Sequence, residues 1–230
     1  MSKTLFNERM KLADIISANP SLILMLPRFG ISLGFGDQSV KQVCQHHQVS
    51  ADFVILIFNV YTFNDYLPSV DELSCINMEH LIPYLEASHV YYLQQRLPHI
   101  ERHLKHVADT IEPRYSQILL QFMTDYEKEV NDHFQEEEKN VFPVLQRMQQ
   151  GEKTDGNLAS HFIDGHSDIE DKLSDLTAIV YKYLPPNAIP DESIELVFDI
   201  LQLSTDLEKH ALIEEKIMLP YANYLSGRLK

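Results

Sequence analysis

The sequence predicts an all-α protein, an up-down-up-down four-helix bundle preceded by a small helical domain. Glycine is scarce, with seven in 230 residues, fewer than the turns of a sheet protein usually need. Long stretches carry apolar residues at spacings of three and four, the period of one helix face. Short links containing proline or glycine separate these stretches, so neighbouring helices are expected to run antiparallel.

The first 68 residues are predicted to form the small domain. Its expected helices span residues 21–29, 39–47 and 50–63. Ser39 and Ser50 are suitable N-caps because a serine hydroxyl can accept a backbone N–H of the first turn. Pro68 and Asp71 lie in a polar break, which we take as the boundary with the bundle, residues 69–230.

Four long helices are expected in the bundle. They span roughly residues 73–110, 114–150, 157–184 and 191–227. Pro113 precedes the second helix, Gly151 and Gly156 follow it, and Pro190 precedes the fourth. Pro98 lies inside the first helix and is expected to kink it, because proline has no N–H and its ring clashes with the preceding turn.

Composition excludes several classes of partner. The chain has 19 Lys and Arg against 34 Asp and Glu, a formal net charge of −15, which repels nucleic acid and anionic membranes. Its apolar runs are too short to span a bilayer, and the N-terminus lacks a secretory signal pattern. Cys44 and Cys75 are too few for a disulfide framework. A cytoplasmic protein is therefore expected.

An eleven-residue motif occurs twice in the chain. It reads HFQEEEKNVFP from His133 and HALIEEKIMLP from His210, and the shared His, Glu, Glu, Lys and Pro each differ by 77 positions. A further histidine precedes each copy by 44 residues, at His89 and His166. Each half therefore supplies a lone histidine on one helix and a His-x-x-x-Glu on the next.

These side chains are predicted to meet at one level of the bundle. Each histidine lies 20 or 24 residues from the turn that joins its helices, a difference of about 6 Å. A His and a Glu four residues apart share a helix face, so both can point inward. The alternative is that the motifs form a solvated outer face. The candidate metal ligands are His89, His133, Glu137, His166, His210 and Glu214.

This donor set favours two iron ions. Imidazole also binds Zn, Cu and Ni, but bridging carboxylates and higher coordination numbers favour Fe or Mn over tetrahedral zinc. Two octahedral ions offer about twelve positions, which four His, two bridging Glu and an oxo or hydroxo bridge nearly fill. About one position per ion then stays open for a small ligand.

The remaining polar residues near these motifs are given structural roles. Glu138 and Glu215 are expected to face solvent or lysines, unless a rotated helix makes either of them a ligand in place of its neighbour. Solvated or core positions are expected for His99, His103 and His106.

The repeated motif resembles the hemerythrin-like family, whose His-x-x-x-Glu helices hold a non-haem di-iron centre. The resemblance is strongest at HFQEEEKNVFP, DGHSDIEDKL and DLEKHALIEEKIMLP. Oxygen-carrying hemerythrins use a fifth His and an Asp. Four His, two Glu and an N-terminal helical module are instead similar to the bacterial iron–sulfur cluster repair di-iron proteins. That resemblance implies terminal histidine ligands, with Glu137 and Glu214 as bridges.

Two departures from that family are visible. The Gly-rich stretch FGISLGFGDQS lacks the Cys-Cys pair that those proteins carry there, which puts a thiol-based role of the module in doubt. The family's first-helix histidine has a proline eight residues downstream, a place that falls on Val90, whereas the 44-residue spacing selects His89.

The resemblance implies repair of iron–sulfur clusters damaged by nitric oxide or peroxide, through iron donation or NO removal. Damaged iron–sulfur proteins and the gases NO and O2 would be the partners, and a homodimer is possible. The alternative is a sensor that binds O2 or NO reversibly and signals through the N-terminal module. A redox enzyme that reduces NO or oxidises ferrous iron is a third possibility.

Overall fold

The computed structural model describes residues 5–152, 158–184 and 190–228, and within these ranges it contains helices and no β-strand. The all-α prediction is confirmed. Contacts divide the chain into two units, which are described separately. One comprises residues 1–88, 145–154 and 212–230, and the other comprises residues 89–144 and 155–211. The domain boundary at residue 68 stays a prediction.

The N-terminal helices of the first unit follow the sequence signals closely. They are α1 (Leu12–Ala18), the 3-10 helix η1 (Pro20–Phe29), α2 (Val40–His47) and α3 (Ala51–Thr62). The hydroxyl of Ser39 accepts the N–H of Gln42, and the hydroxyl of Ser50 accepts the N–H of Phe53. Both predicted N-caps are therefore confirmed, and each satisfies a donor that the first turn leaves unpaired.

The two cysteines of this unit differ in exposure, and we expect them to differ in reactivity. Burial raises the pKa of the Cys44 thiol to about 11, whereas Cys75 is exposed. At pH 8 about one Cys44 thiol in a thousand is ionised, and the thiolate is the nucleophile. Iodoacetamide should therefore label Cys75 and spare Cys44 until denaturant is added. Mass spectrometry checks this, and labelling of Cys44 in the native protein would contradict it.

The first bundle helix is interrupted, so the prediction of one helix over residues 73–110 is wrong at its start. A short helix, α4 (Val70–Ser74), ends at Ser74, and a separate helix, α5 (Met78–Tyr91), begins after Asn77. The side chain of Asn77 accepts the backbone N–H of Glu79 at 3.0 Å. This bond satisfies a first-turn donor of α5, so the new helix starts at its own cap.

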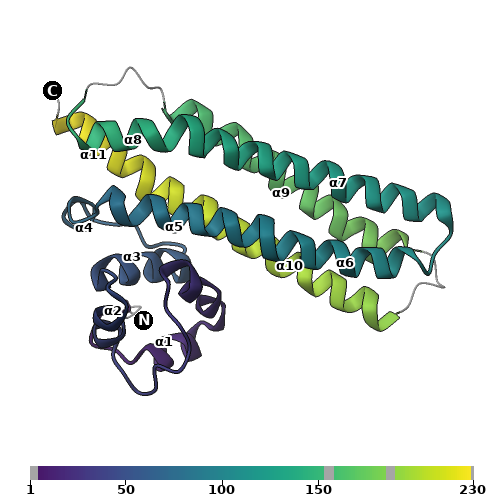
Figure 1. The fold of residues 1–230 in the computed structure, drawn as a ribbon, viewed down its shortest axis with the longest axis horizontal. Coiled ribbons are helices and arrows are strands. Elements are labelled where there is room, and N and C mark those ends of the chain that lie inside the picture. The colour runs from purple at the N-terminus through teal and green to yellow at the C-terminus, as the bar shows by residue number, and fades with distance from the viewer. Residues whose placement is uncertain (1–4, 153–157, 185–189, 229–230) are drawn as a thin grey trace. The chain divides into compact units, whose positions relative to one another are not determined.

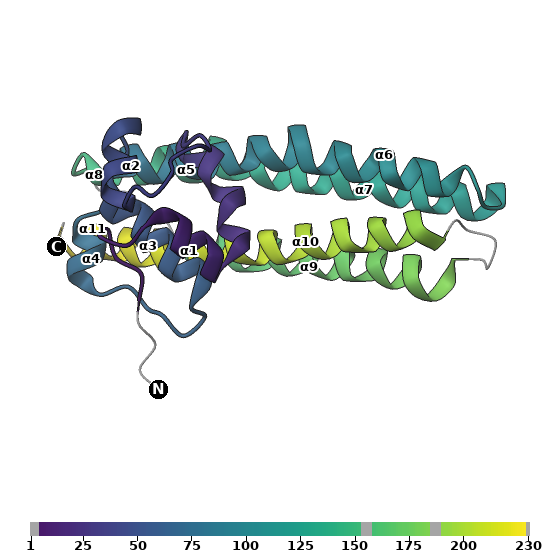
Figure 2. The same ribbon diagram turned by 90° about the horizontal axis from the view of Figure 1, so that it is seen from below.

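Four helices run side by side in the second unit. They are α6 (Leu97–Ala108), α7 (Pro113–Glu136), α9 (Leu158–Tyr183) and α10 (Pro190–Ile213). Figures 1 and 2 show them from two sides, with the chain direction alternating from one helix to the next. Their apolar faces enclose one core, which includes Ile100, Leu104, Leu119, Met123, Tyr126, Val130, Leu173, Leu176, Leu196, Ile200 and Leu203. The predicted bundle is therefore confirmed.

Three π-helical turns lie within the helical paths of the described residues. They are η2 (Tyr92–Arg96), η3 (Glu137–Val141) and η4 (Glu214–Met218), with α8 (Phe142–Gln149) after η3 and α11 (Leu219–Arg228) after η4. In each, the residue after the turn donates its N–H to the carbonyl five residues earlier. The next residue is always a proline: Pro98, Pro143 or Pro220.

The π turns accommodate the three prolines that follow them. A proline inside a regular α-helix lacks the donor for the carbonyl four residues back, and its ring collides with that carbonyl. One extra residue in the preceding turn moves that carbonyl aside and keeps the helix continuous. At Pro98, where the sequence predicts a kink, the chain therefore forms a π turn. None of the helices in the described ranges is long and apolar enough to cross a lipid bilayer.

Candidate metal centre

Four of the six predicted ligands come together in a buried group. Ligand atoms of His89, Glu137, His210 and Glu214 all lie within 4.8 Å of one another. Their exposed fractions are 1%, 3%, 2% and 0%. Glu214 follows His210 by one turn on the same uninterrupted helical path. The alternative of a solvated outer face is therefore wrong for these residues.

The π turns place the two carboxylates of this group. Glu137 is the first residue of η3, and Glu214 is the first residue of η4. Each stands four residues after a histidine of the repeated motif, His133 or His210. Single π turns inside α-helices are frequent at functional sites, since the added residue redirects the neighbouring side chains.

His89 is oriented by a hydrogen bond from outside the group. Its Nδ1 lies 2.9 Å from Oε1 of Glu138, and this hydrogen bond lowers the pKa of the Glu138 carboxyl. An ionised carboxylate only accepts hydrogen bonds, so Nδ1 is the donor, and a neutral imidazole then has its lone pair on Nε2. Glu138 is exposed, as expected, but one of its oxygens also contacts His89.

The Nε2 atom of His89 faces the other members of the group. Nε2 of His89 lies 3.3 Å from Nε2 of His210 and 3.3 Å from Oε2 of Glu137. Converging nitrogen and oxygen donors at these separations can share one cation. Buried carboxylates so close together are costly without a compensating positive charge. The donor set therefore fits a metal such as iron.

Glu137 lies between two imidazoles. Its Oε2 faces His89, and its Oε1 is 3.3 Å from Nε2 of His133. A carboxylate with one histidine at each oxygen is suitably placed to join two ions. His133 is outside the four-residue group, and 11% of its side chain is exposed. His166 is on α9, but its side chain lies outside the described residues.

Aromatic rings enclose the histidines. The Phe134 ring stacks on His89 at 4.0 Å and 6°, and the Phe142 ring lies 5.8 Å from His89. The Tyr92 ring is 5.6 Å from His210, and its hydroxyl donates to the backbone carbonyl of Asp206 at 3.1 Å. These rings keep water away from the histidines, and a dry surrounding strengthens the attraction between ligands and a cation.

The structure also shows why the first-helix histidine departs from the repeat. His89 precedes its π turn by three residues, whereas His133 and His210 precede theirs by four. Tyr92 therefore occupies the position that a glutamate holds in the other two turns. Val90, the other candidate, is 46% exposed and is not in the group. The sequence shows this difference in the spacing from histidine to proline. The proline follows His89 by nine residues, but it follows His133 and His210 by ten.

We expect Glu138→Ala to weaken iron binding without unfolding the protein. The change removes the partner of His89 Nδ1, and loss of such a partner typically lowers metal affinity by about 10- to 100-fold. Competition with a chelator measures the affinity. The control is Glu215→Ala, because Glu215 is the exposed counterpart of Glu138 in the second motif. Equal affinities of the two variants would contradict a role for Glu138.

Comparison with known proteins agrees with this site. The family model of the hemerythrin HHE cation binding domain matches residues 79–222, well over half of the chain. The matched range contains all six predicted ligands and the three π turns. A search of curated proteins gave no match. The buried His/Glu group is suited to hold the cation after which the family is named, typically iron, and the chain belongs to the hemerythrin HHE cation-binding domain family.

Proposed function

We propose that the protein holds two iron ions in this centre and repairs iron–sulfur clusters damaged by nitrosative or oxidative stress. The observation that carries the proposal is the position of Glu137 between His89 and His133, which suits a ligand shared by two ions. The group of four buried ligands contains no aspartate among the described residues, unlike the set expected of an oxygen carrier.

Each residue has a role in this proposal. The terminal ligands would be His89, His133, His166 and His210, and the bridging ligands would be Glu137 and Glu214. A bound iron pair would supply exchangeable metal and redox chemistry at this place. Phe134 and Phe142 keep water from His89, while Glu138 fixes its proton on Nδ1.

Glu138 also supports donation of iron to another protein. Its side chain is 40% exposed, although the imidazole it contacts is only 1% exposed. A carboxylate at the solvent edge, directly behind a buried ligand, can accept a metal ion that leaves the centre. Damaged iron–sulfur proteins would be the recipients, and NO or O2 would be the small ligands.

The test uses protein loaded with isotopically labelled iron under anaerobic conditions. It is mixed with a [4Fe–4S]-dependent hydro-lyase that nitric oxide has inactivated, and the recovered activity and transferred label are measured. We expect recovery with the wild type and with Glu215→Ala, and none with His210→Ala. Iron that stays on the protein while the hydro-lyase remains inactive would contradict repair. Reversible NO binding with retained iron would identify a sensor instead.

A further inference from the structure

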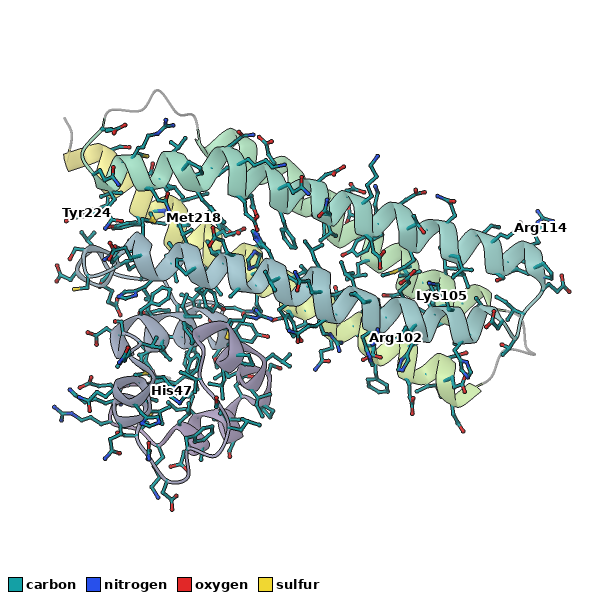
Figure 3. The ribbon with its side chains drawn as sticks, in the orientation of Figure 1. His47, Arg102, Lys105, Arg114, Met218 and Tyr224 are labelled. Atoms are coloured by element: carbon teal, nitrogen blue, oxygen red, sulfur yellow. The ribbon has the colours of Figure 1, made fainter. Side chains whose placement is uncertain are left out.

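A second group of metal-binding side chains lies away from the centre described above. It consists of His99 and His103 on α6 and Asp199 on α10, whose ligand atoms lie within 4.8 Å of one another. His99 follows His89 by ten residues, about 15 Å along the helical path. Figure 3 marks this part of α6 with the labels of Arg102 and Lys105.

The helix brings the two imidazoles to one face. Residues four apart on a helix are neighbours, and the rings of His99 and His103 have their centroids 4.5 Å apart. Both rings face the same oxygen, because Oδ2 of Asp199 lies 3.1 Å from Nε2 of His99 and 2.8 Å from Nδ1 of His103. Two nitrogens and one oxygen therefore converge from two helices.

The contact at His103 differs from an ordinary hydrogen bond. Its Nδ1 is buried and close to Oδ2 of Asp199, yet it has no hydrogen-bond partner of acceptable geometry. Nε2 of His99, by contrast, does form a hydrogen bond with Oδ2 of Asp199. A ring nitrogen and a carboxylate oxygen held this close without a well-aligned hydrogen bond are suited to share a cation.

Asp199 is held in place from its other side. Nη2 of Arg96 donates to the backbone carbonyl of Asp199 at 3.2 Å and lies 3.4 Å from its Oδ1. The same nitrogen donates to Oε1 of Gln202 at 3.0 Å. Oδ1 is therefore directed at Arg96, which leaves Oδ2 for the histidines. Outer partners of this kind orient the ligands of metal sites.

We propose that His99, His103 and Asp199 form a second metal site, which binds one divalent transition ion such as Zn²⁺ and ties α6 to α10. Two imidazoles and one carboxylate with a fourth position open to water are a common zinc donor set. The side chains of the histidines are 37% and 36% exposed, so an ion can enter from solvent. The net charge of −15 raises the local concentration of cations.

The test is calorimetric titration of the iron-loaded protein with Zn²⁺. Iron content is measured before and after, so that displacement from the first centre is detected. We expect one additional Zn²⁺ per chain and a zinc-dependent rise in Tm. The double variant His99→Gln/His103→Gln should lose both effects. The control is His106→Gln, which changes the neighbouring pair of His106 and Glu192, 3.0 Å apart, and should keep both.

Two results would overturn the second site. One is a wild type that binds no additional Zn²⁺ up to about 1 mM, the weak end of specific binding. The other is a double variant that binds Zn²⁺ as the wild type does. Both histidines are partly exposed, so glutamine there leaves the core unchanged. Should the double variant lose its helical circular dichroism, the single variants His99→Gln and His103→Gln decide, each with an expected loss of at least tenfold in affinity, about 1.4 kcal/mol.

Discussion

His210→Ala should remove most of the iron from the protein, from the proposed content of about two ions per chain to fewer than one. The imidazole is 2% exposed, and its Nε2 is 3.3 Å from that of His89, so no water or neighbouring side chain replaces it readily. Its loss also leaves the carboxylates of Glu137 and Glu214 buried with less compensation. Elemental analysis of protein expressed with added iron measures the content.

The control for this experiment is His106→Ala. His106 is an exposed histidine that contacts Glu192 and belongs to neither of the two proposed metal sites. It should keep the wild-type iron content, because it changes the same residue type at the surface. Full iron content in His210→Ala would show that the buried group is not the iron site.

Phe134→Ala should be among the most destabilising single changes, lowering the free energy of unfolding by about 3–5 kcal/mol. Phe134 is 2% exposed, stacks on His89 and packs in the bundle core. Its removal leaves a cavity beside a metal ligand. Urea unfolding of the metal-free protein measures the packing loss alone, and iron titration then reports how far His89 has lost its fixed orientation.

Phe198→Ala is the matched control for Phe134→Ala. The Phe198 side chain is 69% exposed, so the same substitution there should change stability by less than about 0.5 kcal/mol. Similar effects of the two substitutions would mean that Phe134 contributes little to the core. A large stability loss with unchanged iron affinity would mean that the ring packs the bundle without positioning His89.

Much of the fold could be predicted from local signals in the sequence. Ser39 and Ser50 act within one turn of themselves, so their roles as caps are visible in the sequence. The bundle helices are long enough for their apolar period to be unmistakable. The break before α5 was missed because apolar residues continue through it, and only the amide of Asn77 marks the new helix start.

The centre was predictable where the repeat marks it and not where partners come from another helix. The 77-residue repeat and the 44-residue spacing identify His89, Glu137, His210 and Glu214, which the structure brings together. That these four residues bind metal, and that His133 and His166 join them, stays a prediction. The contact of Glu138 with His89 was not predicted, because Glu138 stands next to a predicted ligand and neighbours on a regular helix point about 100° apart.

The contacts of Glu138 with His89 and of His103 with Asp199 are difficult to predict from the sequence for the same reason. Glu138 contacts His89 across 49 positions of the chain, and Asp199 lies 96 positions after His103. Helical periodicity assigns a face to each residue but says nothing of which side chain stands opposite. The histidines of α6 were consequently interpreted as solvated or core residues, although two of them converge on one carboxylate oxygen.

The π turns have a consequence for how this chain can change by insertion and deletion. Each is a single added residue within a helix, so an alignment with a relative that lacks one needs a gap inside the helix, where gaps are normally avoided. Deleting one residue between Tyr92 and Arg96 would rotate the preceding part of the helix by about 100° relative to the rest. His89 would then point away from Glu137, so a one-residue deletion in this helix would be more damaging than most substitutions on its surface.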